Sequence, residues 1–256
     1  MIRLTSLLLL VPVLALPSPI KLTPLPGTMV VHCDVPLLGN ERFSAVLPKV
    51  LGDRHHVFLN EPQACSVKWE GPGPSGEWTV SSAPGTSADF RITLAPTEDR
   101  VDIRYSVTNH SDVPMEDVWM LTYFAPREAI WVVGDPLSRI TMEGPAGPVT
   151  LDATDRPKGN RPELAVYPRL SAPPLPYFIR TLQPASSSVS HGDRMTCRRP
   201  DGATVSVEAT PAAFLFNNRD LASLHVAPSF GTVAPGATVQ AQGFWKFSAA
   251  PKASPD

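Results

Sequence analysis

The stretch that decides the fold is Arg100–Phe124, RVDIRYSVTNHSDVPMEDVWMLTYF. From Val101 to Thr108, apolar residues alternate with polar ones, which is the period of a strand with one buried face and one exposed face. The turn-forming side chains of Asn109 to Pro114 follow, and a second apolar run extends from Val118 to Phe124. The stretch therefore predicts a long β-hairpin.

Strand-like segments continue on both sides of this stretch, separated by turn residues at a spacing of about ten residues, as an antiparallel sandwich requires. The region 152–176 is rich in Pro and Arg and shows little periodicity, so we expect a long loop there. Near the end, Pro235 and Gly236 predict a tight turn before a last strand. In that strand Val239, Ala241, Gly243, Trp245 and Phe247 share one face. The other expected strands are 27–31, 41–50, 67–69, 77–82, 90–94, 177–182, 204–209 and 213–216.

The composition favours strands over helices and excludes some partners. The 256 residues include 30 prolines, roughly twice the average share of about 5%, and they are spread so that no long helix has room between them. The formal net charge is −2, and no basic stripe could follow a phosphate backbone, so we expect no nucleic-acid partner. No apolar run reaches the length of a membrane span.

The first residues predict export. Arg3 precedes the apolar run 7–16, and small residues at Val13 and Ala15 predict cleavage after Ala15. We therefore expect a signal peptide at 1–15, a proline-rich arm at 16–26, one β-sandwich domain at 27–248 and a polar tail at 249–256. The mature protein would be secreted or periplasmic.

The cysteine and histidine pattern predicts neither a metal nor a cofactor. The chain has three cysteines, Cys33, Cys65 and Cys197, and the exported location favours a disulfide between Cys33 and Cys65, with other pairings left open by the odd count. No histidine or cysteine pair has the short spacing of a zinc site. Asn109-His110-Ser111 is a glycosylation sequon if the source glycosylates.

Two blocks resemble the galactose mutarotase-like family, which contains the aldose epimerases. They are DRVDIRYSVTNHSDVPMEDVWMLTYF at 99–124 and SFGTVAPGATVQAQGFWKF at 229–247. The resemblance implies an all-β fold, a large antiparallel β-sandwich of the supersandwich type. Since similar blocks also occur in immunoglobulin-like domains, one or two Ig-like sandwiches remain the alternative.

The resemblance also implies that the epimerase acid and base are missing. Matching Tyr123 and Phe124 to the family's His-Ser-Tyr-Phe segment puts Leu121 at the position of the general acid, and leucine donates no proton. Only Asp220 could stand in for the family's glutamate base. The histidines His55 and His56 fall near the place of another active-site histidine of the family.

For a sugar site we expect an aromatic platform with planar polar groups around it. Trp131 could supply the platform, and Asn217, with its neighbour Asn218, Arg219 and His225 could supply the polar groups. The alternatives are ordinary core packing for Trp131 and His225, and a turn at Asn217–Asp220.

These observations predict an exported carbohydrate-binding or carbohydrate-associated protein without clear catalytic residues, with a glycan as its partner. One alternative is an epimerase or lyase-like enzyme that uses His55 or His56 with His225 or Asp220. Another is a structural Ig-like module of the cell surface. The sequence indicates neither the glycan nor the oligomeric state.

Overall fold

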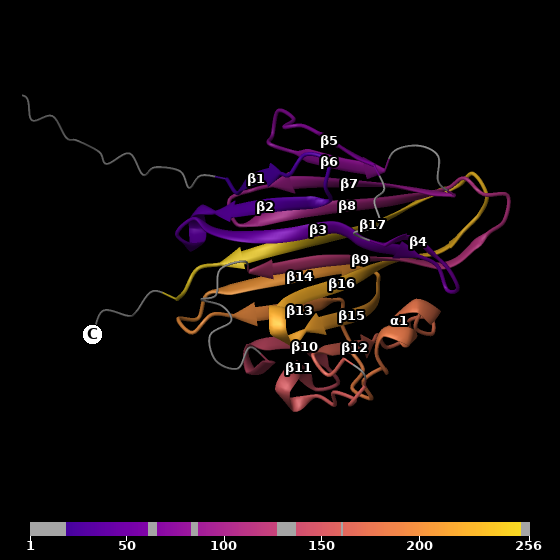
Figure 1. Ribbon diagram of the computed structural model, residues 1–256. Coiled ribbons are helices and arrows are strands. Elements are labelled where there is room, and N and C mark those ends of the chain that lie inside the picture. The colour runs from indigo at the N-terminus through magenta and orange to yellow at the C-terminus, as the bar shows by residue number, and fades with distance from the viewer. Residues whose placement is uncertain (1–18, 61–65, 83–86, 127–136, 160, 252–256) are drawn as a thin grey trace, which may run out of the picture.

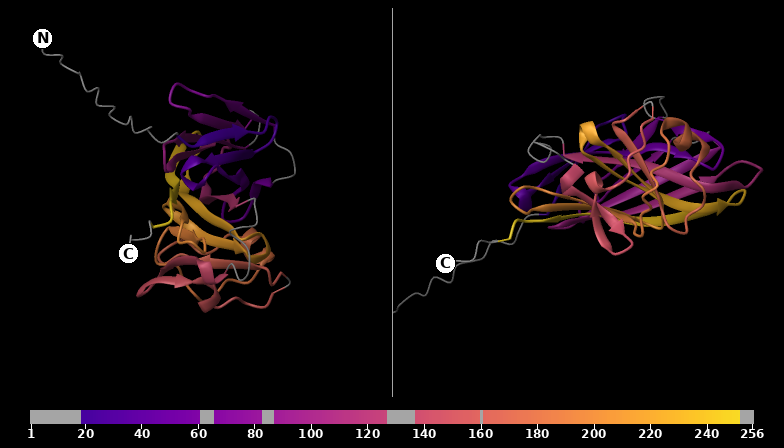
Figure 2. Two further views of the ribbon diagram at one scale, coloured as in Figure 1. Left: turned by 90° about the vertical axis from the view of Figure 1, so that its left-hand side faces the viewer. Right: turned by 90° about the horizontal axis from the view of Figure 1, so that it is seen from below.

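The computed structural model describes residues 19–60, 66–82, 87–126, 137–159 and 161–251. The chain forms two large antiparallel sheets, one of eight strands and one of nine (Figure 1). They lie face to face along most of their length, as the side views show (Figure 2). This confirms the large β-sandwich, and the alternative of one or two Ig-like sandwiches is wrong. Within the described ranges, no helix is both long enough and apolar enough to cross a membrane.

Sheet A has the strand order β1-β2-β3-β9-β16-β15-β12, with β4 paired to β3. Its strands are β1 (Lys21–Pro24), β2 (Val30–Val35), β3 (Glu41–Gly52), β4 (Val57–Asn60), β9 (Met115–Pro126), β12 (Leu164–Pro168), β15 (Ala212–Asn218) and β16 (Ser223–Val233).

Sheet B has the order β11-β10-β13-β14-β17-β8-β7-β6-β5. Its strands are β5 (Val67–Glu70), β6 (Trp78–Ser82), β7 (Ala88–Pro96), β8 (Arg100–Asn109), β10 (Ile140–Gly144), β11 (Gly147–Thr150), β13 (Arg194–Arg198), β14 (Thr204–Thr210) and β17 (Thr238–Ser248). The described helices are short: α1 (Tyr177–Leu182) and the single 3-10 turns Pro36–Leu38, Leu137–Arg139, Leu151–Ala153 and Arg219–Leu221.

The central stretch forms its two strands as predicted, but they do not pair as a hairpin. Strand β8 lies in sheet B between β7 and β17, whereas β9 lies in sheet A between β3 and β16. Residues 110–114 therefore carry the chain from one sheet to the other. The expected hairpin is wrong because other strands take both edges of β8 and β9: β8 pairs with its sequence neighbour β7 and with the distant β17, and β9 pairs with the distant β3 and β16.

A second crossing, from β16 to β17, lies beside the first one. Asn109 joins them: its Nδ2 donates to the carbonyl oxygens of Val113 at 2.8 Å and Val233 at 2.9 Å, and its Oδ1 accepts from Ser111. The backbone adds a bond from Gly236 N to Asn109 O at 2.8 Å. Asn109 is fully buried with both amide hydrogens donated, so the sequon Asn109-His110-Ser111 is not accessible in the folded protein.

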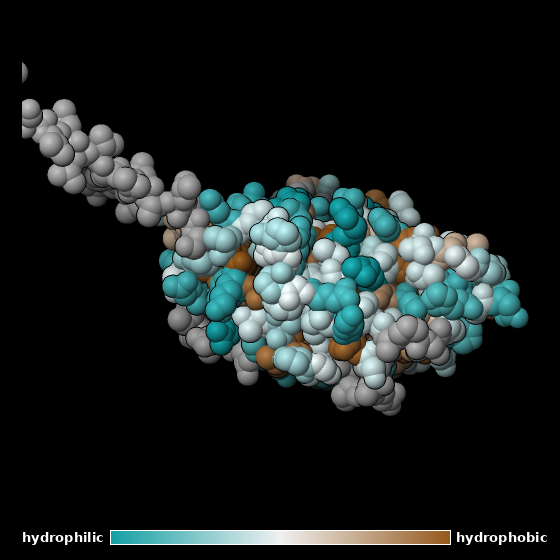
Figure 3. All heavy atoms as spheres, turned by 90° about the horizontal axis from the view of Figure 1, so that it is seen from above, coloured by the Kyte–Doolittle hydropathy of each residue, from teal (hydrophilic) through white to brown (hydrophobic). Residues whose placement is uncertain are grey.

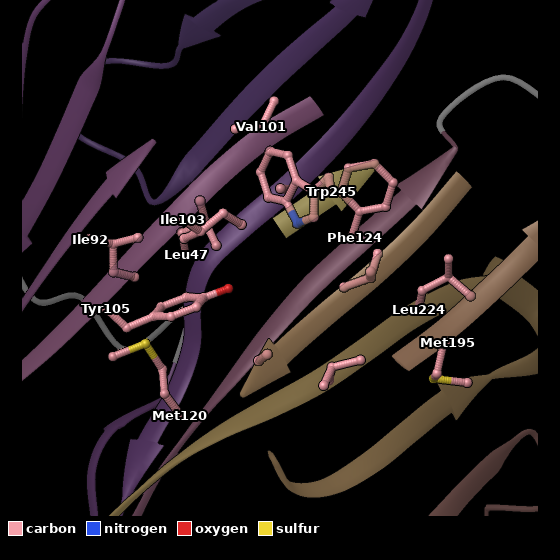
Figure 4. Packing of buried hydrophobic residues seen from close by; sticks show 14 of the residues in the cluster. Leu47, Ile92, Val101, Ile103, Tyr105, Met120, Phe124, Met195, Leu224 and Trp245 are labelled. Atoms are coloured by element: carbon pink, nitrogen blue, oxygen red, sulfur yellow. The ribbon is translucent and has the colours of Figure 1, made fainter. Parts of the chain in front are cut away.

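The main core fills the space between the two sheets (Figure 4). Trp245 of β17 packs on Phe124 of β9 with ring centroids 4.8 Å apart, and Phe43 stacks on Phe124 at 5.4 Å. Ala241, Trp245 and Phe247 are buried on one face of the last strand, as its alternation predicts. The two blocks of the sequence that carry the family resemblance thus meet in the centre of the core.

Four local expectations are wrong. The expected loop 152–176 contains strand β12, which is largely buried and pairs with β15. Residues 177–182 form a helix instead of a strand, because Ile179 is buried against the outer face of sheet A together with Phe178 and Leu182. The expected proline-rich arm contains a strand, β1, whose Leu22 is buried in the core. Cys33 is a buried free thiol, which contradicts the expected disulfide, and Cys197 is also free; Cys65 lies outside the described residues.

The outer surface carries few large apolar side chains. The face seen from above is mostly hydrophilic, with hydrophobic residues scattered in small groups (Figure 3). The exposed large hydrophobic residues of the described chain are Leu37, Val113, Leu170, Tyr177 and Leu221. Single exposed apolar residues of this kind are normal for a soluble surface.

Candidate functional site

A second, smaller apolar cluster lies on the outer face of sheet A, away from the main core. Helix α1 covers one part of this face. Phe178 stacks on Trp119 with ring centroids 6.5 Å apart and an interplanar angle of 16°. The Trp119 indole in turn donates to the carbonyl oxygen of Asp53 at 2.9 Å, and Tyr177 N donates to Arg54 O at 3.0 Å. The helix is thereby fixed against the sheet.

Beside α1 the outer face of sheet A is hollowed into a pocket of about 430 Å³. We call it the outer pocket. A volume of this size is within the range of about 300 to 1,000 Å³ that is typical of small-molecule sites. Its lining residues are Lys49, Val50, Asn60, Leu121, Tyr123, Arg161, Leu164, Phe178, Leu182, Phe216, Asn218, Leu221 and His225.

Strand register brings these residues together. Phe216 of β15 lies opposite His225 of β16, and Asn218 lies opposite Leu164 of β12. Alternation places residues two positions apart on the same face of a strand, so Leu121 and Tyr123 of β9 both face the pocket. The pocket therefore spans five neighbouring strands of one sheet, from β3 to β12.

His225 forms part of the pocket wall, but neither of its nitrogens is free. Its Nδ1 donates to the Thr122 carbonyl oxygen at 2.8 Å, which leaves Nε2 to accept from the Ser223 hydroxyl at 2.7 Å. The ring is also enclosed by Tyr123 and Phe216, with centroids 5.1 and 5.0 Å away. Burial, together with the nearby charge of Lys49, lowers the pKa of His225 to about 3. The imidazole is neutral at pH 7 and holds its neighbours in place.

The remaining polar groups of the pocket are better placed to meet a ligand. The Lys49 ammonium lies 5.2 Å from the centroid of the Tyr123 ring. Burial raises the pKa of the Tyr123 hydroxyl, so this group stays protonated at neutral pH. Arg161 and the side chain of Asn60 complete the polar part of the lining. Aromatic and hydrogen-bonding residues thus line the same cavity.

Asn217 does not reach the pocket, contrary to prediction. It is one residue away from Asn218 on the same strand and faces the other side of the sheet. There its side chain donates to Ser223 O at 2.9 Å and accepts from Arg156 at 3.0 Å. Arg156 also donates to the Tyr167 hydroxyl at 3.1 Å. The group anchors the loop 151–163, which is a structural task.

The other residues expected at the site lie elsewhere. Arg219 is on an exposed 3-10 turn, where its Nε lies 3.3 Å from Asp220 Oδ1. Neither residue lines the pocket. This agrees with the alternative reading of that segment as a turn. His55 and His56 lie in the turn between β3 and β4, where both backbone amides donate to Asp53. Trp131 lies outside the described residues.

Sequence reasoning missed the residues that surround His225. Lys49 is a charged residue inside the otherwise buried end of β3, where Leu47, Val50 and Leu51 are all buried. That interruption was a signal, because a strand that is apolar on both sides rarely holds a lysine without a reason. Nothing local distinguishes Asn218 from Asn217, since their assignment to opposite faces depends on the register with β12.

The titratable residues among the described lining of the pocket are Lys49, Tyr123, Arg161 and His225. Leu121, the residue that the resemblance puts at the acid position, is on the pocket wall and 3% exposed. No aspartate or glutamate lines the pocket within the described ranges, and His225 has both nitrogens engaged. The same part of the chain contains no group of three or more histidine, cysteine or acidic residues that could hold a metal ion.

The sequence matches no protein-family model and no curated protein, but its structure has neighbours among solved proteins. A galactose mutarotase-related enzyme from Lactobacillus acidophilus is 10% identical, with a TM-score of 0.49, over 93% of this chain and 100% of that chain. An aldose 1-epimerase-like protein from Escherichia coli K12 is 9% identical, with a TM-score of 0.47, over 91% and 100%.

A third neighbour is a glycoside hydrolase family 97 enzyme from Pseudoalteromonas sp. strain K8, seen in complex with acarbose. It is 14% identical, with a TM-score of 0.48, over 90% of this chain and 34% of that chain. This chain therefore spans about a third of the hydrolase. At these identities, and with TM-scores below 0.5, the neighbours carry no conclusion about what this chain does.

Proposed function

We propose that this protein is an exported carbohydrate-binding β-sandwich that holds a sugar in the outer pocket without transforming it. The observation that carries the proposal is the lining of that pocket, which combines the rings of Tyr123, Phe178 and Phe216 with the polar residues Lys49 and Asn218. A sugar ring has apolar faces that rest on aromatic rings and fixed hydroxyls that need hydrogen-bond partners. The pocket offers both.

Binding without turnover is supported by the state of the titratable groups. Opening or inverting a sugar at its anomeric carbon needs a proton donor and a proton acceptor within hydrogen-bond reach. His225 is held neutral with both nitrogens bonded. Among the described lining residues, the other titratable groups are a lysine, an arginine and a tyrosine, and no carboxylate stands beside them.

A glycan-array screen of the chain from Leu16 onward, followed by titration calorimetry, tests the binding. Tyr123→Ala removes one aromatic wall, and we expect at least about tenfold weaker binding, as loss of a stacking ring commonly costs. Tyr177→Ala is the matched control, because Tyr177 is 59% exposed on α1 and outside the pocket. Binding that is equal in both variants, or no binding to any sugar, would refute the proposal.

Export is proposed from the signal-peptide pattern at residues 1–15 alone. Expression with the native first residues, followed by N-terminal sequencing of the exported product, tests it. The expected product begins at Leu16. A product that keeps Met1 and stays inside the cell would contradict this part.

A further inference from the structure

The charged residues that line the outer pocket are all positive within the described chain. Lys49 and Arg161 are its charged lining residues within the described chain, and no carboxylate faces them. Other arginines of the protein have acidic partners: Arg42 meets Asp34 at 2.6 Å, and Arg194 meets Glu208 at 2.7 Å. No ion pair of this kind joins Lys49 or Arg161 to an acidic residue in the described chain. Among the residues that the structure describes, the lining of the pocket thus provides two positive charges and no negative one.

The surroundings of Lys49 make this more than an ordinary surface charge. Its ammonium lies over the Tyr123 ring at 5.2 Å, at the wall on which a sugar would rest. The same Tyr123 ring contacts His225, whose two nitrogens are bonded to Thr122 and Ser223. A positive charge held beside apolar rings in a partly enclosed site interacts more strongly with an anion than it would in open water.

We infer that the outer pocket selects a sugar that carries an anionic group, a carboxylate or a phosphate, which Lys49 and Arg161 bind while Tyr123 supports the ring. The inference rests on the proposed function, since it names the class of sugar. A guanidinium binds a carboxylate or a phosphate through two parallel hydrogen bonds, and an ammonium adds a point charge. Neutral sugars would bring no negative charge to either cation.

The test compares four ligands by titration calorimetry on the full mature chain. They are galactose, galacturonate, galactose 6-phosphate and inorganic phosphate. We expect at least one of the two anionic sugars to bind about tenfold or more tightly than galactose, since a charge-assisted contact is worth about 1.5 to 3 kcal/mol. Which anionic sugar is preferred distinguishes the carboxylate from the phosphate.

The variants assign this preference to the two cations. Lys49→Met keeps the length and the apolar stem of the side chain but removes the charge, and Arg161→Gln removes the guanidinium. In each variant, the dissociation constants for the anionic and the neutral sugars are expected to differ by no more than about threefold. Lys158→Met is the control, because Lys158 is exposed on the same loop as Arg161 but does not line the pocket.

The outcomes separate the two proposals. If galactose and both anionic sugars bind equally well, the inference is wrong while the proposed sugar site stands. If the preference exists but survives both variants, these cations do not create it, and the inference also fails. If inorganic phosphate binds as tightly as the anionic sugars, the site is a simple anion site. If none of the sugars binds, both proposals fall.

Discussion

Replacing Asn109 by alanine tests whether the two crossings between the sheets are joined as described. The change removes the Nδ2 bonds to Val113 O and Val233 O and the Oδ1 bond from Ser111 N. The bond to Val233 is buried, and leaving such a carbonyl without a partner costs about 2 kcal/mol, whereas each of the other two bonds contributes about 1 kcal/mol. We therefore expect the free energy of unfolding to fall by about 4 kcal/mol.

Urea denaturation followed by fluorescence measures this loss directly. In a thermal melt the same change would lower Tm by roughly 10 °C, since 1 kcal/mol corresponds to about 2 to 4 °C in a domain of this size. Asn109→Asp keeps the acceptor for Ser111 but faces two carbonyl oxygens with a carboxylate. It should therefore destabilise the protein at least as much at pH 7.

Substitutions of the two following residues serve as controls. His110→Ala removes an exposed ion-pair partner of Asp89, and a pair of this kind contributes at most about 1 kcal/mol. Ser111→Ala removes only a part-buried hydroxyl. If the free energy of unfolding of Asn109→Ala lies within about 1 kcal/mol of that of these two variants, this side chain does not hold the crossings together, and the reasoning is refuted.

Two further predictions concern pH and packing. His225 has a pKa of about 3 in the folded protein against an ordinary value of 6.5. As the pH falls, the unfolded chain therefore takes up a proton on this imidazole before the folded protein does. The free energy of unfolding should therefore fall by about 1.4 kcal/mol for each pH unit below 6.5. Chemical denaturation at several pH values measures this slope, which should be smaller in His225→Gln. Gly243→Ala would place a Cβ 2.3 Å from the Glu208 carbonyl oxygen and 3.1 Å from Tyr105, so we expect a clear drop in Tm. Gln242→Ala, the exposed neighbour, should leave Tm nearly unchanged; equal melting of the two variants would contradict the close approach of the strands.

The parts of the fold that depend on local alternation could be predicted from the sequence. The buried faces of β8 and β17 follow directly from the two-residue period, because a strand with one dry face must alternate. The family resemblance of the same two blocks led to the large sandwich. What could not be predicted is which strands pair: a turn sequence such as that at 109–114 reverses the chain equally well within one sheet or between two sheets.

The candidate site shows the same limit. His225 lines the pocket, but its two bonded nitrogens and 1% exposure agree with the alternative of core packing, which its apolar neighbours Leu224 and Val226 indicate. The sequence does not distinguish Asn217 from Asn218, since only the register with β12 decides which of the two faces the pocket. Helix α1 was missed because six residues rich in aromatic and β-branched side chains have no helical preference of their own. Its contacts with Trp119 and Arg54 supply the stability.

The pairing of the central strands with the last ones also governs the order in which the protein can assemble. β8 pairs with β17, where Thr108 meets Thr238 across 130 residues, and β9 pairs with β16. A nascent chain that ends at Ala222 lacks both late strands, so each sheet has an open edge in its middle rather than at its border. Such edges attract strands from other chains, and contacts between distant residues form slowly. The protein is therefore most exposed to aggregation in the interval before its last thirty or so residues arrive, and C-terminal truncation should be far more damaging than loss of the same length from the N-terminus.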